Sequence, residues 1–244
     1  MPDFGVASPA LAPVTVVCGH YGVGKTNLAL NLAVDAAGAG REVVLVDLDV
    51  VNPYFRSSDY RALLEGRGVR LVAPVFAGTT LDSPSVSGEI DTAIGWAQAA
   101  PAEGAPGRLL LIDAGGDDIG TTALGRYAGA IAEAPYAMLY VVNARRNLTQ
   151  RPEEALGLLR EIEAEAKLSA SAVVNNSHLK QETDAAVIAA GLPFAREAAR
   201  LAGLPLAFTT APCGIAREEI ERAGGLGEED ALYPVQIYVR TPWE

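Results

Sequence analysis

Cysteine, lysine and long apolar runs are scarce in this 244-residue chain, and each shortage argues against a class of protein. Cys18 and Cys213 lie far apart and have no C-x-x-C partner, so neither a disulfide framework nor a thiolate zinc site is expected. Only three lysines and a net charge of −11 disfavour a surface that wraps nucleic acid. No apolar run approaches the ~20 residues of a spanning helix and the first residues lack a basic segment, so we expect a cytoplasmic protein.

Apolar, β-branched runs alternate with Ala- and Leu-rich helical stretches through most of the chain. The predicted strands lie near residues 14–18, 43–48, 108–113, 136–143, 170–175 and 204–210. The helix after the first strand is expected to end near Gly38, and a later helix to begin at Pro152 with acids in its first turn.

Strands that are apolar throughout, without alternation, are typical of a parallel sheet covered on both faces. We therefore predict an α/β fold with a doubly wound, mostly parallel sheet and helices on both faces. The chain is expected to form a single domain over residues 1–244, in which residues 1–13 are an extended lead-in and residues 233–244 an extended tail.

Residues 19–26 read GHYGVGKT, the pattern G-x-x-x-x-G-K-[ST], between an apolar strand and an amphipathic helix. Glycines in this pattern let successive backbone N–H groups turn around phosphate oxygens, and the helix adds its positive N-terminus. Lys25 is expected to contact the β- and γ-phosphates, and Thr26 to hold Mg²⁺ through its hydroxyl. The predicted nucleotide-binding residues of this P-loop are Gly19, Gly22, Val23, Gly24, Lys25, Thr26 and Asn27.

Acidic residues end two of the predicted strands, and hydrolysis needs carboxylates to hold the water shell of the metal and orient the attacking water. Four apolar residues precede Asp113, which is the Walker B form, and Gly116 follows in a D-x-x-G turn suited to sensing a γ-phosphate. Asp47 and Asp49 alternate and so share one side of a strand end. The predicted metal ligands are Thr26, Asp47, Asp49 and Asp113, and the predicted catalytic residues are Lys25, Asp49 and Asp113.

These motifs occur in a fixed order over residues 14–215: a Walker A loop, D-x-D after the next strand, then a Walker B strand with D-x-x-G. In this order they resemble the ParA/MinD-like ATPases, a SIMIBI-class P-loop family. The resemblance implies a doubly wound parallel sheet, ATP and Mg²⁺ as cofactors and a nucleotide-dependent homodimer. It also implies that Asp49 orients water at the start of a switch I segment, residues 49–56, and that Asp113 is the Walker B residue.

The loop departs from this family at His20 and Tyr21. The family's loop usually reads G-K-G-G-x-G-K-T, and its first lysine reaches across the dimer to the nucleotide of the partner. A cation supplied in trans can contribute roughly 10³–10⁵ in rate, so hydrolysis is expected to be slow or partner-stimulated unless another residue replaces it. His20, Arg56 and Arg146 are the alternatives for that role, beside a plain packing role for His20.

The nucleotide base is expected to be adenine, because the chain has no [NT]-K-x-D tetrapeptide to recognise guanine. Asn175 ends a predicted strand in a way similar to the family's adenine-side asparagine, although it would equally cap a turn. Pro212 follows the last predicted core strand, where the base would lie.

The sequence favours an ATP hydrolase that acts as a switch on an unidentified protein partner, and it disfavours nucleic acid or membrane as that partner. Residues 233–244 cannot form a basic amphipathic helix for a membrane, and no cysteine pair suggests metallocluster assembly. One alternative is an ATP-dependent ligase or phosphotransferase related to dethiobiotin synthetase or cobyrinate-amidating enzymes, with residues 75–92 as its acceptor pocket. A nucleotide-binding module with negligible turnover is the other.

Overall fold

The computed structural model describes residues 9, 11–49, 57–73, 84–116, 118–146, 151–179 and 182–239. Its strands are β1 (Val14–Cys18), β2 (Glu42–Leu48), β3 (Val69–Val72), β4 (Arg108–Ala114), β5 (Tyr136–Val142), β6 (Ala172–Asn175), β7 (Leu206–Pro212) and β8 (Leu232–Val235). Its helices are α1 (Lys25–Gly38), the 3₁₀ helix η1 (Ser57–Tyr60), α2 (Arg61–Glu65), α3 (Pro84–Gln98), α4 (Asp118–Gly125), α5 (Ala128–Ile131), α6 (Pro152–Ala166), α7 (Ala185–Ala202) and α8 (Arg217–Arg222).

All eight strands form one sheet in the order β3-β2-β4-β1-β5-β6-β7-β8, and every neighbouring pair is parallel. From β1 the chain builds the sheet first toward β2, β3 and β4, and then in the other direction from β5 to β8. The predicted doubly wound α/β sheet is therefore confirmed. The carboxyl end of β1 lies where the strand order reverses, which is where such sheets bind ligands.

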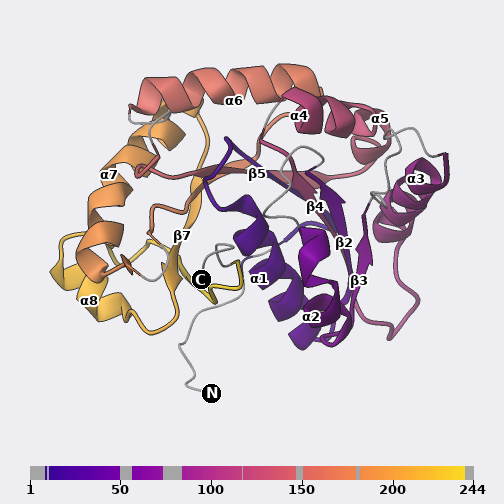
Figure 1. Ribbon diagram of the computed structural model, residues 1–244, viewed down its shortest axis with the longest axis horizontal. Coiled ribbons are helices and arrows are strands. Elements are labelled where there is room, and N and C mark those ends of the chain that lie inside the picture. Colours follow the sequence, from indigo (N-terminus) through magenta and orange to yellow (C-terminus); the bar gives the residue numbers. More distant parts are fainter. Residues whose placement is uncertain are drawn as a thin grey trace.

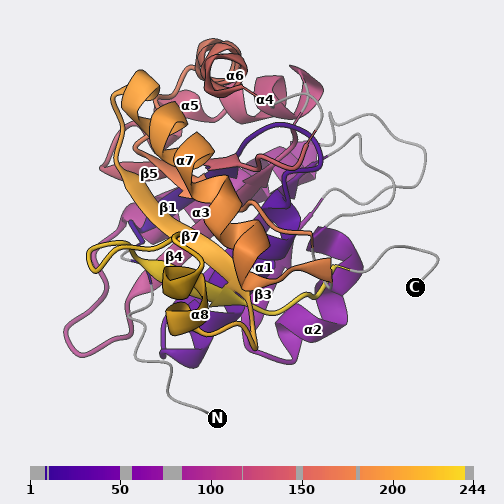
Figure 2. The same ribbon diagram turned by 90° about the vertical axis from the view of Figure 1, so that its left-hand side faces the viewer.

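Helices cover both faces of the sheet (Figures 1 and 2). The strands therefore do not alternate between apolar and polar residues, and β4 is an example. Leu109 and Leu111 pack in one apolar cluster with Leu28 and other residues of α1. Leu110 and Ile112, one residue along in each case, pack in a second cluster with residues of α3, α6 and α7. Helices α1 and α2 thus cover one face, and α3 to α7 cover the other.

The six predicted strands are present, with β6 and β7 each beginning two residues later than expected. The predicted helix ends at Gly38 and Pro152 are confirmed, and Glu154 accepts a hydrogen bond from the backbone N–H of Arg151 to cap α6. Strand β3 was missed, because the exposed Arg70 interrupts its four residues and leaves no apolar run. Strand β8 lies at the start of the predicted extended tail, and residues 240–244 are outside the described residues.

Candidate nucleotide-binding site

The P-loop, residues 19–26, follows β1 and runs directly into α1. Its glycines at 19, 22 and 24 all have positive φ. At Gly24 the φ of 93° is left-handed, and a Cβ there would collide with the side-chain amide of Asn176. Only glycine suits this position, since it tolerates the left-handed backbone and leaves room for the amide. The carbonyl of Gly24 accepts the first bond of α1, from the N–H of Leu28 at 3.1 Å.

The ammonium group of Lys25 is folded back over the P-loop. Lys25 is 5% exposed, and its Nζ donates to the carbonyl of His20 at 3.1 Å. Gly116 lies on the same side, because a Cβ built on it would be 2.6 Å from Lys25 Nζ and 2.6 Å from the backbone N of Tyr21. The structure therefore brings the predicted phosphate sensor, Gly116, against the predicted phosphate-binding lysine.

The two acidic strand ends are neighbours in the sheet, since Asp47 of β2 and Asp113 of β4 are Cα partners. Asp47 accepts backbone N–H bonds from Asp49 at 3.0 Å and from Ser58 at 2.9 Å, one on each oxygen. Asp113 Oδ2 accepts a bond from the Ser57 hydroxyl at 2.8 Å. Both serines belong to η1, so the short helix that follows residues 49–56 is attached to both carboxylates.

Burial dominates the electrostatics of this pair. Burial, and after it the negative charge of Asp47, raise the pKa of Asp113 to about 7, although Lys25 opposes both effects. Burial also raises the pKa of Asp47 to about 6, against backbone hydrogen bonds from Ser58 and Asp49 that favour its charged form. Two desolvated carboxyls beside a lysine are typical of a functional site rather than of a packed core.

The residues present fit Mg²⁺ and phosphate. Asp113 Oδ1 is buried and has no hydrogen-bond partner among the described residues, although such an atom is costly to leave unsatisfied. Thr26 lies next to Lys25 and is 8% exposed, and Asp49 is 7% exposed. No three His, Cys, Asp or Glu side chains in the described ranges form a metal cluster by themselves. This suits Mg²⁺, which typically takes one or two carboxylates and completes its shell with water and phosphate oxygens.

Asn176 was missed by the sequence analysis and holds the P-loop in place. Its Nδ2 donates to the carbonyl of Val23 at 2.6 Å, and its Oδ1 accepts from Thr210 Oγ1 at 2.5 Å and from the ring Nε2 of His178 at 3.1 Å. All four residues are buried. The only signal in the sequence was a second asparagine after an apolar strand.

Asn175, the residue predicted at the adenine, is turned into the sheet. Its Nδ2 donates to Thr209 Oγ1 at 3.4 Å and its Oδ1 accepts from the N–H of Ser177 at 3.2 Å. Pro212 ends β7 on the neighbouring strand and is half-buried. The roles of both residues at a base remain predictions, and the turn-capping alternative for Asn175 matches the bond to Ser177.

A model of the CobQ/CobB/MinD/ParA nucleotide binding domain matches residues 14–188. The chain belongs to this family. The match covers the P-loop, both acidic strand ends and Asn176, so nucleotide binding by a ParA/MinD-type P-loop domain is confirmed as the general function. Comparison with curated proteins gives no significant match.

Solved structures share the fold of this CobQ/CobB/MinD/ParA-family chain. FtsY from Mycoplasma mycoides is 18% identical with a TM-score of 0.53, over 88% of this chain and 64% of that one. Signal Recognition Particle 54 kDa protein from Aeropyrum pernix, in complex with GDP, is 19% identical with a TM-score of 0.53, over 85% and 43%. This chain therefore spans less than two thirds of either protein, and at these identities the likeness concerns the fold alone.

The side chain of Asn27, predicted to bind nucleotide, is engaged by the segment after β8. Its Nδ2 donates to the carbonyl of Gln236 at 3.0 Å, and its Oδ1 accepts the N–H groups of Tyr238 at 2.9 Å and Val239 at 3.2 Å. Asn31, one turn along α1, exchanges two further bonds with the backbone of Gln236. Because its side chain is occupied, we expect Asn27 to bind nucleotide through its backbone N–H, and this stays a prediction.

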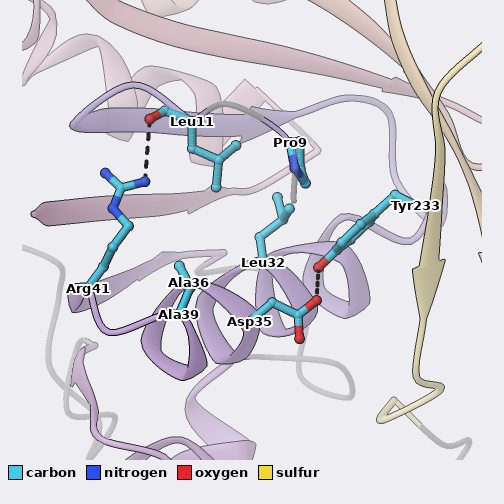
Figure 3. A pocket seen from close by; sticks show the side chains of 8 residues that line it. All are labelled: Pro9, Leu11, Leu32, Asp35, Ala36, Ala39, Arg41 and Tyr233. Atoms are coloured by element: carbon cyan, nitrogen blue, oxygen red, sulfur yellow. Dashed lines mark hydrogen bonds between the residues drawn. The ribbon is translucent and has the colours of Figure 1, made fainter. Parts of the chain in front are cut away.

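A small cavity lies near the far end of α1 from the P-loop (Figure 3). It has a volume of about 60 Å³, whereas ligand pockets typically measure ~300–1,000 Å³. Its polar side chains already have partners: Asp35 accepts from the Tyr233 hydroxyl at 2.6 Å, and Arg41 donates to the carbonyl of Leu11 at 3.4 Å. This cavity is too small for a nucleotide.

Within the described ranges, no helix is both long and apolar enough to cross a membrane.

Proposed function

We propose that this protein binds Mg²⁺-ATP, hydrolyses it, and signals its nucleotide state to a protein partner. The observation that carries the proposal is the attachment of η1 to both acidic strand ends, through Ser57 to Asp113 and through Ser58 to Asp47. η1 directly follows residues 49–56, the switch I segment of the family resemblance. A change at the carboxylates on binding or loss of the terminal phosphate would therefore act directly on the backbone next to switch I.

The described residues can be given roles by position. Lys25 would neutralise the β- and γ-phosphates, and its neighbour Gly116 would offer its backbone N–H to the terminal one. Thr26 and Asp113 would hold Mg²⁺, which neutralises phosphate charge and orients the phosphates when bound. Asp49 would orient the attacking water. Asp47, whose two oxygens already accept backbone N–H bonds, would position Asp49 and η1.

ATP rather than GTP is proposed as the nucleotide. Guanine recognition typically needs a carboxylate to accept from N1–H and the exocyclic amine, and residues 175–178 read Asn-Asn-Ser-His without one. The GDP reported with the Aeropyrum pernix protein belongs to that protein, which is similar in fold alone.

A homodimer and slow or partner-stimulated turnover are part of the proposal. The family's trans lysine is absent, and His20 in its place has its ring Nδ1 hydrogen bonded to the carbonyl of Tyr21 at 3.1 Å. Tyr21 is 54% exposed, although most large hydrophobic side chains of the described ranges are buried. An exposed tyrosine on the P-loop supports a contact that forms with another molecule.

Turnover is tested by phosphate release from ATP and Mg²⁺ with the wild type, Lys25→Ala, Asp49→Ala and Asp91→Ala. Lys25→Ala should lose nucleotide binding, and Asp49→Ala should bind ATP but release phosphate at least about 100-fold more slowly. Asp91 is an exposed acid of α3, so its variant controls for loss of charge. If Asp49→Ala binds ATP and hydrolyses it at the wild-type rate, the role of Asp49 in hydrolysis is wrong. If neither protein releases phosphate above background, the negligible-turnover module is favoured.

The switch is tested by sizing the protein by light scattering, with ADP and with a non-hydrolysable ATP analogue. We expect a dimer with the analogue and a monomer with ADP. A monomer under both conditions would overturn the dimeric switch. ADP release that is stimulated by an added small carboxylic acid would favour the ligase alternative instead.

A further inference from the structure

The turn that carries Arg146 is fixed relative to the P-loop. It follows β5, and its Asn143 accepts the N–H of Arg146 on its carbonyl at 3.2 Å and the N–H of Arg145 on its side-chain oxygen at 2.9 Å. The N–H of Ala144 donates to Ser177 Oγ at 2.9 Å, next to Asn176, which holds the P-loop carbonyl. The backbone before Arg146 is therefore tied to the same polar network as the P-loop.

The side chain of Arg146 reaches the P-loop itself. A Cβ built on Gly22 would be 3.8 Å from Arg146 Nε and 4.0 Å from its Cδ and Cζ, an ordinary van der Waals separation. The guanidinium thus lies directly beside the bare backbone of Gly22, whose φ is 77°. Gly22 is separated from Lys25 by only two residues of the P-loop.

Arg146 is not used in an ion pair with any acid of the described ranges, and it is exposed. By contrast, arginines 61, 151, 160, 196, 200 and 217 each bind a carboxylate. In a chain with a net charge of −11, a guanidinium without an acid beside a phosphate-binding loop points to an anionic ligand. Its planar fork of donors is well suited to phosphate oxygens.

Of the three residues considered for the missing cation, Arg146 is the one that this geometry favours. His20 Nδ1 is bonded to a backbone carbonyl, and Arg56 lies outside the described residues. We propose that Arg146 binds the phosphates of the nucleotide held by its own chain, and so provides in cis the second cation of the P-loop. This inference rests on the proposed binding of a nucleoside triphosphate.

The proposal is tested by calorimetric titration of ADP and a non-hydrolysable ATP analogue, with Mg²⁺, into the wild type, Arg146→Ala, Arg146→Lys and Arg145→Ala. Charge-assisted hydrogen bonds of this kind are worth about tenfold or more in affinity, so Arg146→Ala should bind the analogue about tenfold more weakly than the wild type. Arg146→Lys should recover part of the loss. Arg145→Ala, which removes the adjacent exposed arginine, should stay within about twofold.

Two results separate this inference from the proposed function. If Arg146→Ala and Arg145→Ala both bind the analogue as the wild type does, and Lys25→Ala does not bind it, then the role of Arg146 is overturned and the nucleotide site stands. If the wild type itself binds neither nucleotide, both proposals fail together.

A mixing experiment tests the assignment in cis. Arg146→Ala chains are mixed with Lys25→Ala chains, which keep Arg146 but are expected to bind no nucleotide. If Arg146 serves its own chain, the mixture should bind the analogue with the weakened affinity of Arg146→Ala alone. Recovery of wild-type affinity in the mixture would show that Arg146 acts on a partner chain and would overturn the assignment in cis.

Discussion

Replacing Asp113 with asparagine is expected to stabilise the nucleotide-free protein. Burial is the main cause that raises the pKa of Asp113 from 3.8 to about 7. Between these two pH values the folded protein keeps a proton on Asp113 that the unfolded chain loses. Asparagine has nearly the shape of the protonated acid and carries no charge. The Asp113 carboxylate would suit a bound metal, but in the metal-free protein it lowers the free energy of unfolding.

The size and sign of this effect follow from the two pKa values. At ~1.4 kcal/mol per pH unit, a rise in pKa from 3.8 to about 7 corresponds to about 4 kcal/mol in the free energy of unfolding. The wild type loses this stability progressively as pH rises from 3.8, the pKa in the unfolded chain, through about 7. Asp113→Asn should thus be more stable than the wild type by about 4 kcal/mol at pH 8, and by less than about 1 kcal/mol at pH 4.

Urea unfolding followed by far-ultraviolet circular dichroism, in the absence of nucleotide and Mg²⁺, measures this difference directly. Asp91→Asn is the control, because an exposed acid should change the free energy of unfolding by no more than about 0.5 kcal/mol. A variant no more stable than the wild type at pH 8 would refute the reasoning, and so would a gain that is as large at pH 4.

Three further predictions concern the surroundings of the site. Gly116→Ala should weaken nucleotide binding at least about tenfold in a fluorescence titration, because its Cβ would be 2.6 Å from Lys25 Nζ; unchanged affinity would contradict this close approach. Asn176→Ala should lower the free energy of unfolding by about 2 kcal/mol, measured in urea, since it leaves a buried P-loop carbonyl without its donor. Asn27→Ala should speed amide hydrogen exchange at residues 238 and 239, measured by mass spectrometry, whereas equal protection would show that their bonds to Asn27 contribute little.

Much of the fold was predictable because its signals are local. The apolar strands and the helix ends at Gly38 and Pro152 each depend on a few adjacent residues, and the structure has them as predicted. The P-loop pattern is equally local, and it lies between β1 and α1. The pairing of Asp47 with Asp113 was not predictable, because it needs the strand order that places β4 beside β2. A sequence motif gives the residue types at a site but not the neighbours that burial and topology bring to them.

The side chains around the motifs were the least predictable part of the site. Ser57 and Asn176 are small polar residues without a distinctive pattern, and their partners lie 56 and 153 residues away in the sequence. Asn175 was predicted to lie at the base because it ends its strand in a way similar to the family's asparagine, and nothing in the sequence distinguished Asn176, which follows it, as the partner of the P-loop. Arg146 was one of three alternatives for the missing cation, and the position of its side chain beside Gly22 is what favours it.

The bonds from Asn27 and Asn31 to residues 236–239 also bear on the order in which the protein is built. They join the first turns of α1 to chain that lies 205–212 residues later. During synthesis the two asparagines lack these partners until more than 200 further residues have been made. Contacts of such long range form late and slowly in folding. The first turns of α1 should therefore gain these contacts only after residues 236–239 have been made.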